Sequence, residues 1–223
     1  MFGKLFGKRS RVTREPDKIW KNEARKLDGL LAALAPAGPM AARSIVISHF
    51  PLAFRSVETF FQSKGFAFDK LFTPTDGSGL LKRSVYQSAQ RVMLALADVL
   101  PMPTQQRAQD APEWDFEINL LVTEHHPHPD LDDRVLRFAE NLPCPVRICF
   151  HDSLDSALIR HFGGTNIERI MTALNMPEGE AISHAMIEKS IRAAQEKIKK
   201  QAKRNLFAES AELWIRQNLE QGL

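Results

Sequence analysis

The chain has little of what usually identifies the class of a protein. Its 223 residues include only two cysteines, Cys144 and Cys149, which are too few for a disulfide framework. No apolar run approaches the roughly 18 residues that a membrane span needs. The first residues mix basic and apolar side chains and lack the long apolar core of a secretory signal. We therefore expect a cytoplasmic protein.

A phosphate-binding loop is also missing. The segment nearest to one, Gly3 to Ser10, has one residue too few between its glycines and carries Arg9 where the loop needs a magnesium-binding hydroxyl. No predicted strand precedes it. The sequence therefore predicts no nucleotide cofactor held by such a loop.

Alternating strands and helices predict an α/β fold. β-branched and apolar runs favour strands over 44–48, 117–123 and 145–150, and a weaker strand over 66–72. The stretch 91–97 fits a helix by periodicity and a strand by the family resemblance described below, and we assign it as a strand. Strands that alternate with helices predict a parallel sheet. Helices are expected over 17–34, 54–65, 130–141, 154–162, 165–174, 179–203 and 208–219.

The segment 152–200 contains three characteristic runs, Asp152 to Asp155, Arg160 to Gly163 and Ser190 to Ile198. In this order they resemble a junction in the bacterial preprotein translocase ATPase SecA. In that family the second RecA-like lobe ends here and a long scaffold helix begins. The resemblance implies a RecA-like parallel sheet with a C-terminal helical extension. It divides the chain into a basic apolar tail (1–16), a degenerate RecA-like lobe (17–152) and a SecA-like helical extension (153–223).

The same register, followed upstream without a gap, aligns Thr123, Glu124 and His126 with a SecA strand ending. It places Leu136, Phe138 and Asn141 where that family has the arginines of its finger motif. A finger needs its guanidinium at the phosphate. The resemblance therefore implies a non-catalytic, pseudo-ATPase protein, an accessory or partner-binding relative of SecA whose protein partner the sequence does not name.

Charge is unevenly distributed, although the net charge is only +3. Residues 1–14 hold five basic groups and no acid, 110–133 hold eight acids and no Lys or Arg, and 188–204 turn basic again. The basic ends favour an alternative function, a nucleic-acid-binding module on a helicase-derived lobe, which the acidic block opposes. The C-terminal set predicts either a solvated helix face or an anion-binding strip, and comprises Lys197, Lys199, Lys200, Lys203 and Arg204.

The N-terminal residues could contact a membrane. On a helix their apolar groups share one face beside cations, which is typical of a segment lying on an anionic bilayer. The alternative is a disordered basic tail, because two glycines weaken a free helix. The first alternative predicts a cytoplasmic protein peripheral to the inner membrane, in contact through Phe2, Lys4, Leu5, Phe6, Lys8 and Arg9.

A histidine cluster follows the predicted strand 117–123. Imidazoles and carboxylates beyond the carboxyl end of a strand suggest a metal site and a metal-dependent hydrolase. The alternative is a stiff turn between two prolines whose acids cap the next helix. The candidate ligands are His125, His126, His128 and, from the neighbouring strand, His151.

Overall fold

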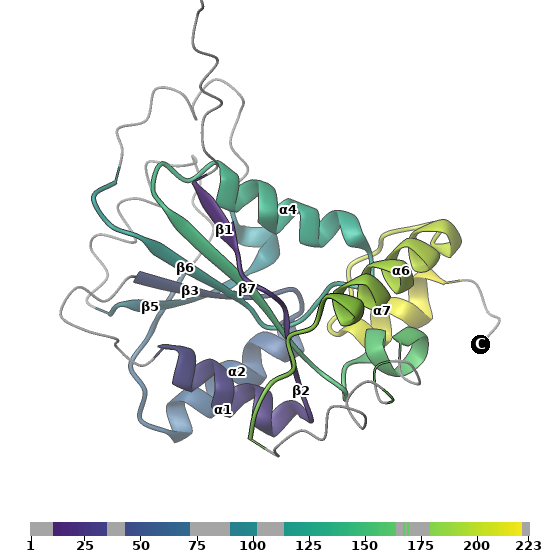
Figure 1. Ribbon diagram of the computed structural model, residues 1–223, viewed down its shortest axis with the longest axis horizontal. Helices are drawn as coiled ribbons and strands as arrows, with labels where there is room; N and C mark the ends of the chain where they lie inside the picture. The colour runs from purple at the N-terminus through teal and green to yellow at the C-terminus, as the bar shows by residue number, and fades with distance from the viewer. Residues whose placement is uncertain are drawn as a thin grey trace, which may run out of the picture.

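The computed structural model describes residues 11–34, 43–71, 90–101, 114–163, 167, 169 and 179–219. Its centre is a sheet of seven parallel strands in the order β1-β7-β6-β3-β5-β4, with β2 also paired to β7 (Figure 1). The predicted α/β fold with a parallel sheet is confirmed. The strands are β1 (Val12–Arg14), β2 (Lys18–Trp20), β3 (Arg43–Ser48), β4 (Asp69–Lys70), β5 (Val92–Leu96), β6 (Ile118–Val122) and β7 (Val146–Ser153).

Helices cover both faces of the sheet (Figure 1). Helix α4 (Pro129–Glu140) covers one face, and α1 (Glu23–Leu34) with α2 (Pro51–Ser63) covers the other. Strand alternation divides the central residues between the two cores, because Ile45 and Ile47 pack under α4 whereas Val46 packs under α1 and α2. Burial on both faces explains the continuous apolar runs of these strands.

The assignment of 91–97 to a strand is confirmed by β5, which pairs with β3 from Ser44↔Val92 to Ser48↔Leu96. A helix at this place would leave the buried backbone groups of β3 without partners on that side. The 3-10 turn Ala97–Val99 follows β5 directly.

The predicted helix over 17–34 is wrong in its first part. Residues Lys18–Trp20 form β2, and α1 begins only at Glu23. Strand β1 also lies inside the stretch 1–16 that was expected to be a tail. Both short strands pair with β7, β1 at Val146 to Ile148 and β2 at His151 to Ser153. Their pairing depends on a strand far away in the sequence, which local periodicity does not report.

The C-terminal part is helical, as predicted, and has its own apolar core. The π-helical turn Ile159–Gly163, α6 (Ala185–Gln201) and α7 (Ala211–Asn218) pack together around Trp214, together with Ile19 and Phe50 from the lobe. This core lies beside the carboxyl ends of the central strands (Figure 1). Most of the helix predicted over 165–174 lies outside the described residues. Within those residues, no helix is long and apolar enough to cross a membrane.

Candidate functional site

The candidate site begins at His125, three residues beyond the end of β6. Its ring lies flat on Phe150 of β7, with ring centroids 4.6 Å apart and planes at 1°. The backbone N–H of His125 donates to Asp152 Oδ2 at 3.3 Å. Parallel sheets commonly hold their sites at the carboxyl ends of the strands, and His125 lies at that edge.

His125 is held between two carboxylates. Its Nδ1 lies 2.7 Å from Asp132 Oδ2, and its Nε2 lies 3.2 Å from Asp17 Oδ2. Burial alone would lower the pKa of His125, but the charges and hydrogen bonds of Asp132 and Asp17 outweigh it and raise the pKa to about 10. Burial alone would raise the pKa of Asp17, but the hydrogen bonds and charges of His125 and then of Arg14 outweigh it and lower the pKa. At neutral pH His125 is therefore an imidazolium between two carboxylates.

Asp132, in the first turn of α4, is the centre of this network. Besides His125 it accepts bonds from the His126 N–H at 2.9 Å and from Gln195 Nε2 at 2.7 Å. His49 Nε2 lies 2.9 Å from Asp132 Oδ1 without the alignment of a hydrogen bond. Burial would raise the pKa of Asp132, but His125 and His49 lower it well below its usual range. The carboxylate stays ionised in the interior because the His125 imidazolium and hydrogen-bond donors surround it.

His126 belongs to an aromatic cluster and not to the ion pairs. Its ring stacks on Phe50 with centroids 4.9 Å apart and meets the edge of Trp214 at 5.1 Å. Its Nδ1 accepts the N–H of His128 at 2.9 Å. Burial and then the charge of His49 lower the pKa of His126 to about 3, so the ring is neutral.

The four candidate metal ligands do not converge. His151 lies on β7, one residue beyond the Phe150 that stacks on His125, and its Nδ1 accepts Trp20 Nε1–H at 3.3 Å. Successive side chains of a strand point to opposite faces, so His151 points away from His125. Within the described residues, no group of three or more His, Cys, Asp or Glu side chains is arranged to hold a metal ion.

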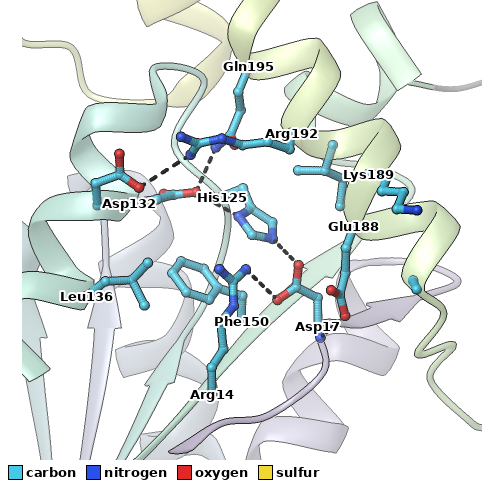
Figure 2. Close-up of a pocket in the computed structure, with 13 residues that line it drawn as sticks. Arg14, Asp17, His125, Asp132, Leu136, Phe150, Glu188, Lys189, Arg192 and Gln195 are labelled. Atoms are coloured by element: carbon cyan, nitrogen blue, oxygen red, sulfur yellow. Dashed lines mark hydrogen bonds and ion pairs between the residues drawn. The ribbon is translucent and has the colours of Figure 1, made fainter. Parts of the chain in front are cut away.

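A cavity of about 520 Å³ opens beside His125 (Figure 2). Its walls come from the N-terminal strand segment, from α4 and from α6. Acidic and basic side chains alternate around it: Arg14 pairs with Asp17 at 3.3 Å, and Arg192 pairs with Asp133 at 3.3 Å. The remaining lining residues include Leu136, Phe150, Glu188, Lys189, Ile191 and Gln195.

A second set of buried charged side chains lies next to the network around His125. Lys26 of α1 is 3% exposed and pairs with Glu23 at 2.8 Å. Burial alone would lower the pKa of Lys26, but the charges of Glu23, Glu124 and Asp152 outweigh it and raise the pKa. Burial raises the pKa of Glu124 to about 8, and its Oε1 has no hydrogen-bond partner.

The two other sets of predicted contact residues have different outcomes. Residues 2–9 lie outside the described residues. The C-terminal strip is exposed on α6 and just beyond it, and Lys199 Nζ forms an ion pair of 2.6 Å with Asp130. Lys199 of this strip is therefore paired with a residue of α4.

Sequence analysis missed two members of the network, Asp17 and Gln195. The sequence places Asp17 in a predicted helix and matches Gln195 only to the SecA junction. A usable signal was present, because Gln195 lies among the buried positions Ile191, Ala194 and Ile198 of α6. A buried amide requires polar partners.

Comparison with known proteins supports the resemblance over part of the chain. The chain is 36% identical over 81 residues to the protein translocase subunit SecA of Aromatoleum aromaticum, which is 36% of this chain and 9% of that protein. It is 36% identical over 102 residues, 44% of this chain and 11% of that protein, to SecA of Trichlorobacter lovleyi. For SecA of Dechloromonas aromatica the identity is 30% over 122 residues, 49% of this chain and 14% of that protein.

The part of the chain that these alignments cover is SecA-like. The chain covers only 9% to 14% of these SecA proteins. No family model matches it. Among solved structures, the C-terminal part of the Fun30 ATPase domain is 13% identical with a TM-score of 0.43, covering 80% of this chain and 56% of that one. The E. coli DEAD-box protein SrmB, bound to RraA, is 13% identical with a TM-score of 0.40, covering 69% and 87%.

Proposed function

We propose that the chain is a non-catalytic, SecA-like accessory protein that binds a partner protein in a process related to protein translocation. The observation that carries the proposal is the use of the polar groups at the sheet edge. Three groups that could do chemistry there, His125, Asp132 and Asp17, each bond to another element of the same fold. Together they fasten the N-terminal strands and α6 to the lobe.

The positions that align with the arginine finger support the same proposal. Leu136 lines the cavity, and Phe138 is 2% exposed in the core beneath α4. Asn141 ends α4, and its side chain donates to the Arg137 carbonyl at 2.6 Å. None of the three supplies a cation, so these positions do not provide the charge stabilisation that a finger gives to phosphoryl transfer.

The SecA-like part of the fold supports the proposal of partner binding. The SecA-like part of the chain holds a lobe with a docked helical extension, and we infer that it acts through its surfaces. We place the protein in the cytoplasm and at the inner membrane, with residues 2–9 as the membrane contact, because their basic and apolar residues suit an anionic interface.

Affinity capture from the native cell tests partner binding. The tagged full chain, expressed at its natural level, is crosslinked briefly and purified, and stoichiometric partners are identified and then rebound with purified components. The matched control is the His125→Gln, Asp132→Asn double variant, which disrupts the docked extension. We expect a partner that binds the intact chain directly and binds the control more weakly. Absence of any direct partner in reconstitution would refute the proposal.

A further inference from the structure

An exposed apolar loop joins α6 to α7. Leu206 is 49% exposed and Phe207 is 67% exposed. Leu52, at the start of α2, is 47% exposed and donates its N–H to the Glu209 carbonyl at 3.0 Å, which brings a third apolar side chain to this end of the loop. Three of the four large exposed hydrophobic residues in the described chain therefore belong to neighbouring segments.

Hydrogen bonds from buried side chains fix the backbone of this loop. Asn218, which is 3% exposed, accepts the Leu206 N–H at 2.6 Å and donates to the Leu206 carbonyl at 3.2 Å. Trp214 Nε1 donates to Asn205 Oδ1 at 2.9 Å, and Ala208 is 5% exposed in the C-terminal core. The loop is thus built with Leu206 and Phe207 projecting outward, and their exposure is not a consequence of loose packing.

The charge beside the loop is positive. Lys200, Lys203 and Arg204 precede the apolar pair within six residues. The nearest acids in sequence are already paired, because Glu209 binds Arg55 at 2.9 Å and Glu212 binds Arg160 at 2.9 Å. Apolar side chains with adjacent cations complement a surface that is apolar beneath and anionic above.

We propose that the loop Asn205–Glu209 is a membrane-contact site that inserts Leu206 and Phe207 into an anionic lipid surface. Aromatic and aliphatic groups bury at the headgroup boundary, and each adjacent Lys or Arg gains from the negative surface potential. Two projecting side chains bury far less surface area than the roughly 1,200 Å² that a stable protein interface buries. The site consists of residues other than 2–9 and does not depend on the proposed partner binding.

Vesicle sedimentation of the full chain tests the site. We expect binding to vesicles of phosphatidylglycerol and phosphatidylcholine, and little binding to phosphatidylcholine alone. Phe207→Ser should weaken binding about tenfold or more, because the buried ring is lost. The matched control is Met186→Ser, which removes a 58% exposed apolar residue elsewhere and should change nothing. Reversal of Lys203 and Arg204 to Glu should weaken binding to the anionic vesicles about tenfold or more.

Phe207→Trp adds a direct report of insertion. We expect a blue shift and quenching by brominated acyl chains on vesicle addition, beyond any change in the wild-type chain. The inference is overturned if the wild-type chain does not bind, or if Phe207→Ser binds as tightly as wild type while deletion of residues 2–9 abolishes binding. Binding to single-stranded RNA without binding to vesicles also overturns it, in favour of a nucleic-acid surface. These results leave the partner-capture experiment unaffected.

Discussion

Gln195 of α6 donates one side-chain amide to both the Asp132 carboxylate at 2.7 Å and the His126 carbonyl at 2.8 Å. The contact joins residues 63 apart in sequence and is buried. It connects the C-terminal helices to the polar groups at the end of β6. The candidate site and the docking of the helical extension therefore form one structure.

Gln195→Ala should destabilise the protein by about 1–3 kcal/mol. The substitution leaves a buried carboxylate and a buried carbonyl each short of a donor, and the cost of such groups exceeds that of the bond alone. Chemical denaturation measures the loss. Gln201→Ala, at the exposed end of the same helix, is the control and should be nearly neutral. Equal effects of the two substitutions would contradict the role of Gln195.

The stability of the protein should fall as the pH rises above neutrality. The folded pKa of His125 is raised to about 10 from an ordinary 6.5, so its stabilisation is complete below pH 6.5 and disappears as the pH rises toward 10. Between pH 8 and 9 His125 holds about one proton more in the folded state than in the unfolded state. The free energy of unfolding should therefore fall by about 1.4 kcal/mol per pH unit from this group.

Other shifted groups add to the slope of the wild-type protein in the same window. Glu124, with a pKa raised to about 8, is still partly protonated in the folded state. The thiols of Cys144 and Cys149 begin to ionise in the unfolded state near pH 9, while burial raises their folded pKa values to about 12 and about 11. Comparison with a variant that lacks the imidazole therefore isolates the contribution of His125. Denaturation of His125→Gln across the same window should show a flatter slope than wild type. An unchanged slope would mean that His125 is not charged between its carboxylates.

Gly29→Ala should destabilise the protein although alanine is the better helix former. A Cβ at Gly29 would collide with the ring of Trp20, which fills the space between β2 and α1. Overpacking typically costs about 1–3 kcal/mol, against a gain of about 1 kcal/mol in helix propensity. Thermal unfolding measures the balance, and Gly179→Ala, which meets no atom within 4 Å, serves as the control. A more stable Gly29→Ala would show that Trp20 is not packed there.

The sequence predicted the parts of the fold that local patterns determine. The strands β3, β6 and β7 are β-branched, apolar runs buried on both faces, and their pattern needs no information from elsewhere. The edge strands β1 and β2 have three residues each and exist because β7 offers free backbone groups. Pairing at such distance is set by topology, so residues 17–20 were predicted as a helix.

The sequence predicts only some of the residues that form the network around His125. His125, His126 and Asp132 follow β6 in sequence, which a reading of local motifs detects. Asp17 and Gln195 arrive from opposite ends of the described chain and turn a possible metal cluster into an ion-paired network. His151 follows the strand predicted over 145–150, which groups it with the other histidines, whereas β7 continues to Ser153 and its alternation turns His151 away from them.

ATP turnover by the purified full chain tests the central claim most directly, since the claim is that the polar groups at this sheet edge hold the fold together and perform no phosphoryl transfer. We predict no phosphate release above a protein-free blank, for wild type and for Asp132→Asn alike. Release that scales with the concentration of wild-type protein and disappears in Asp132→Asn would contradict the account.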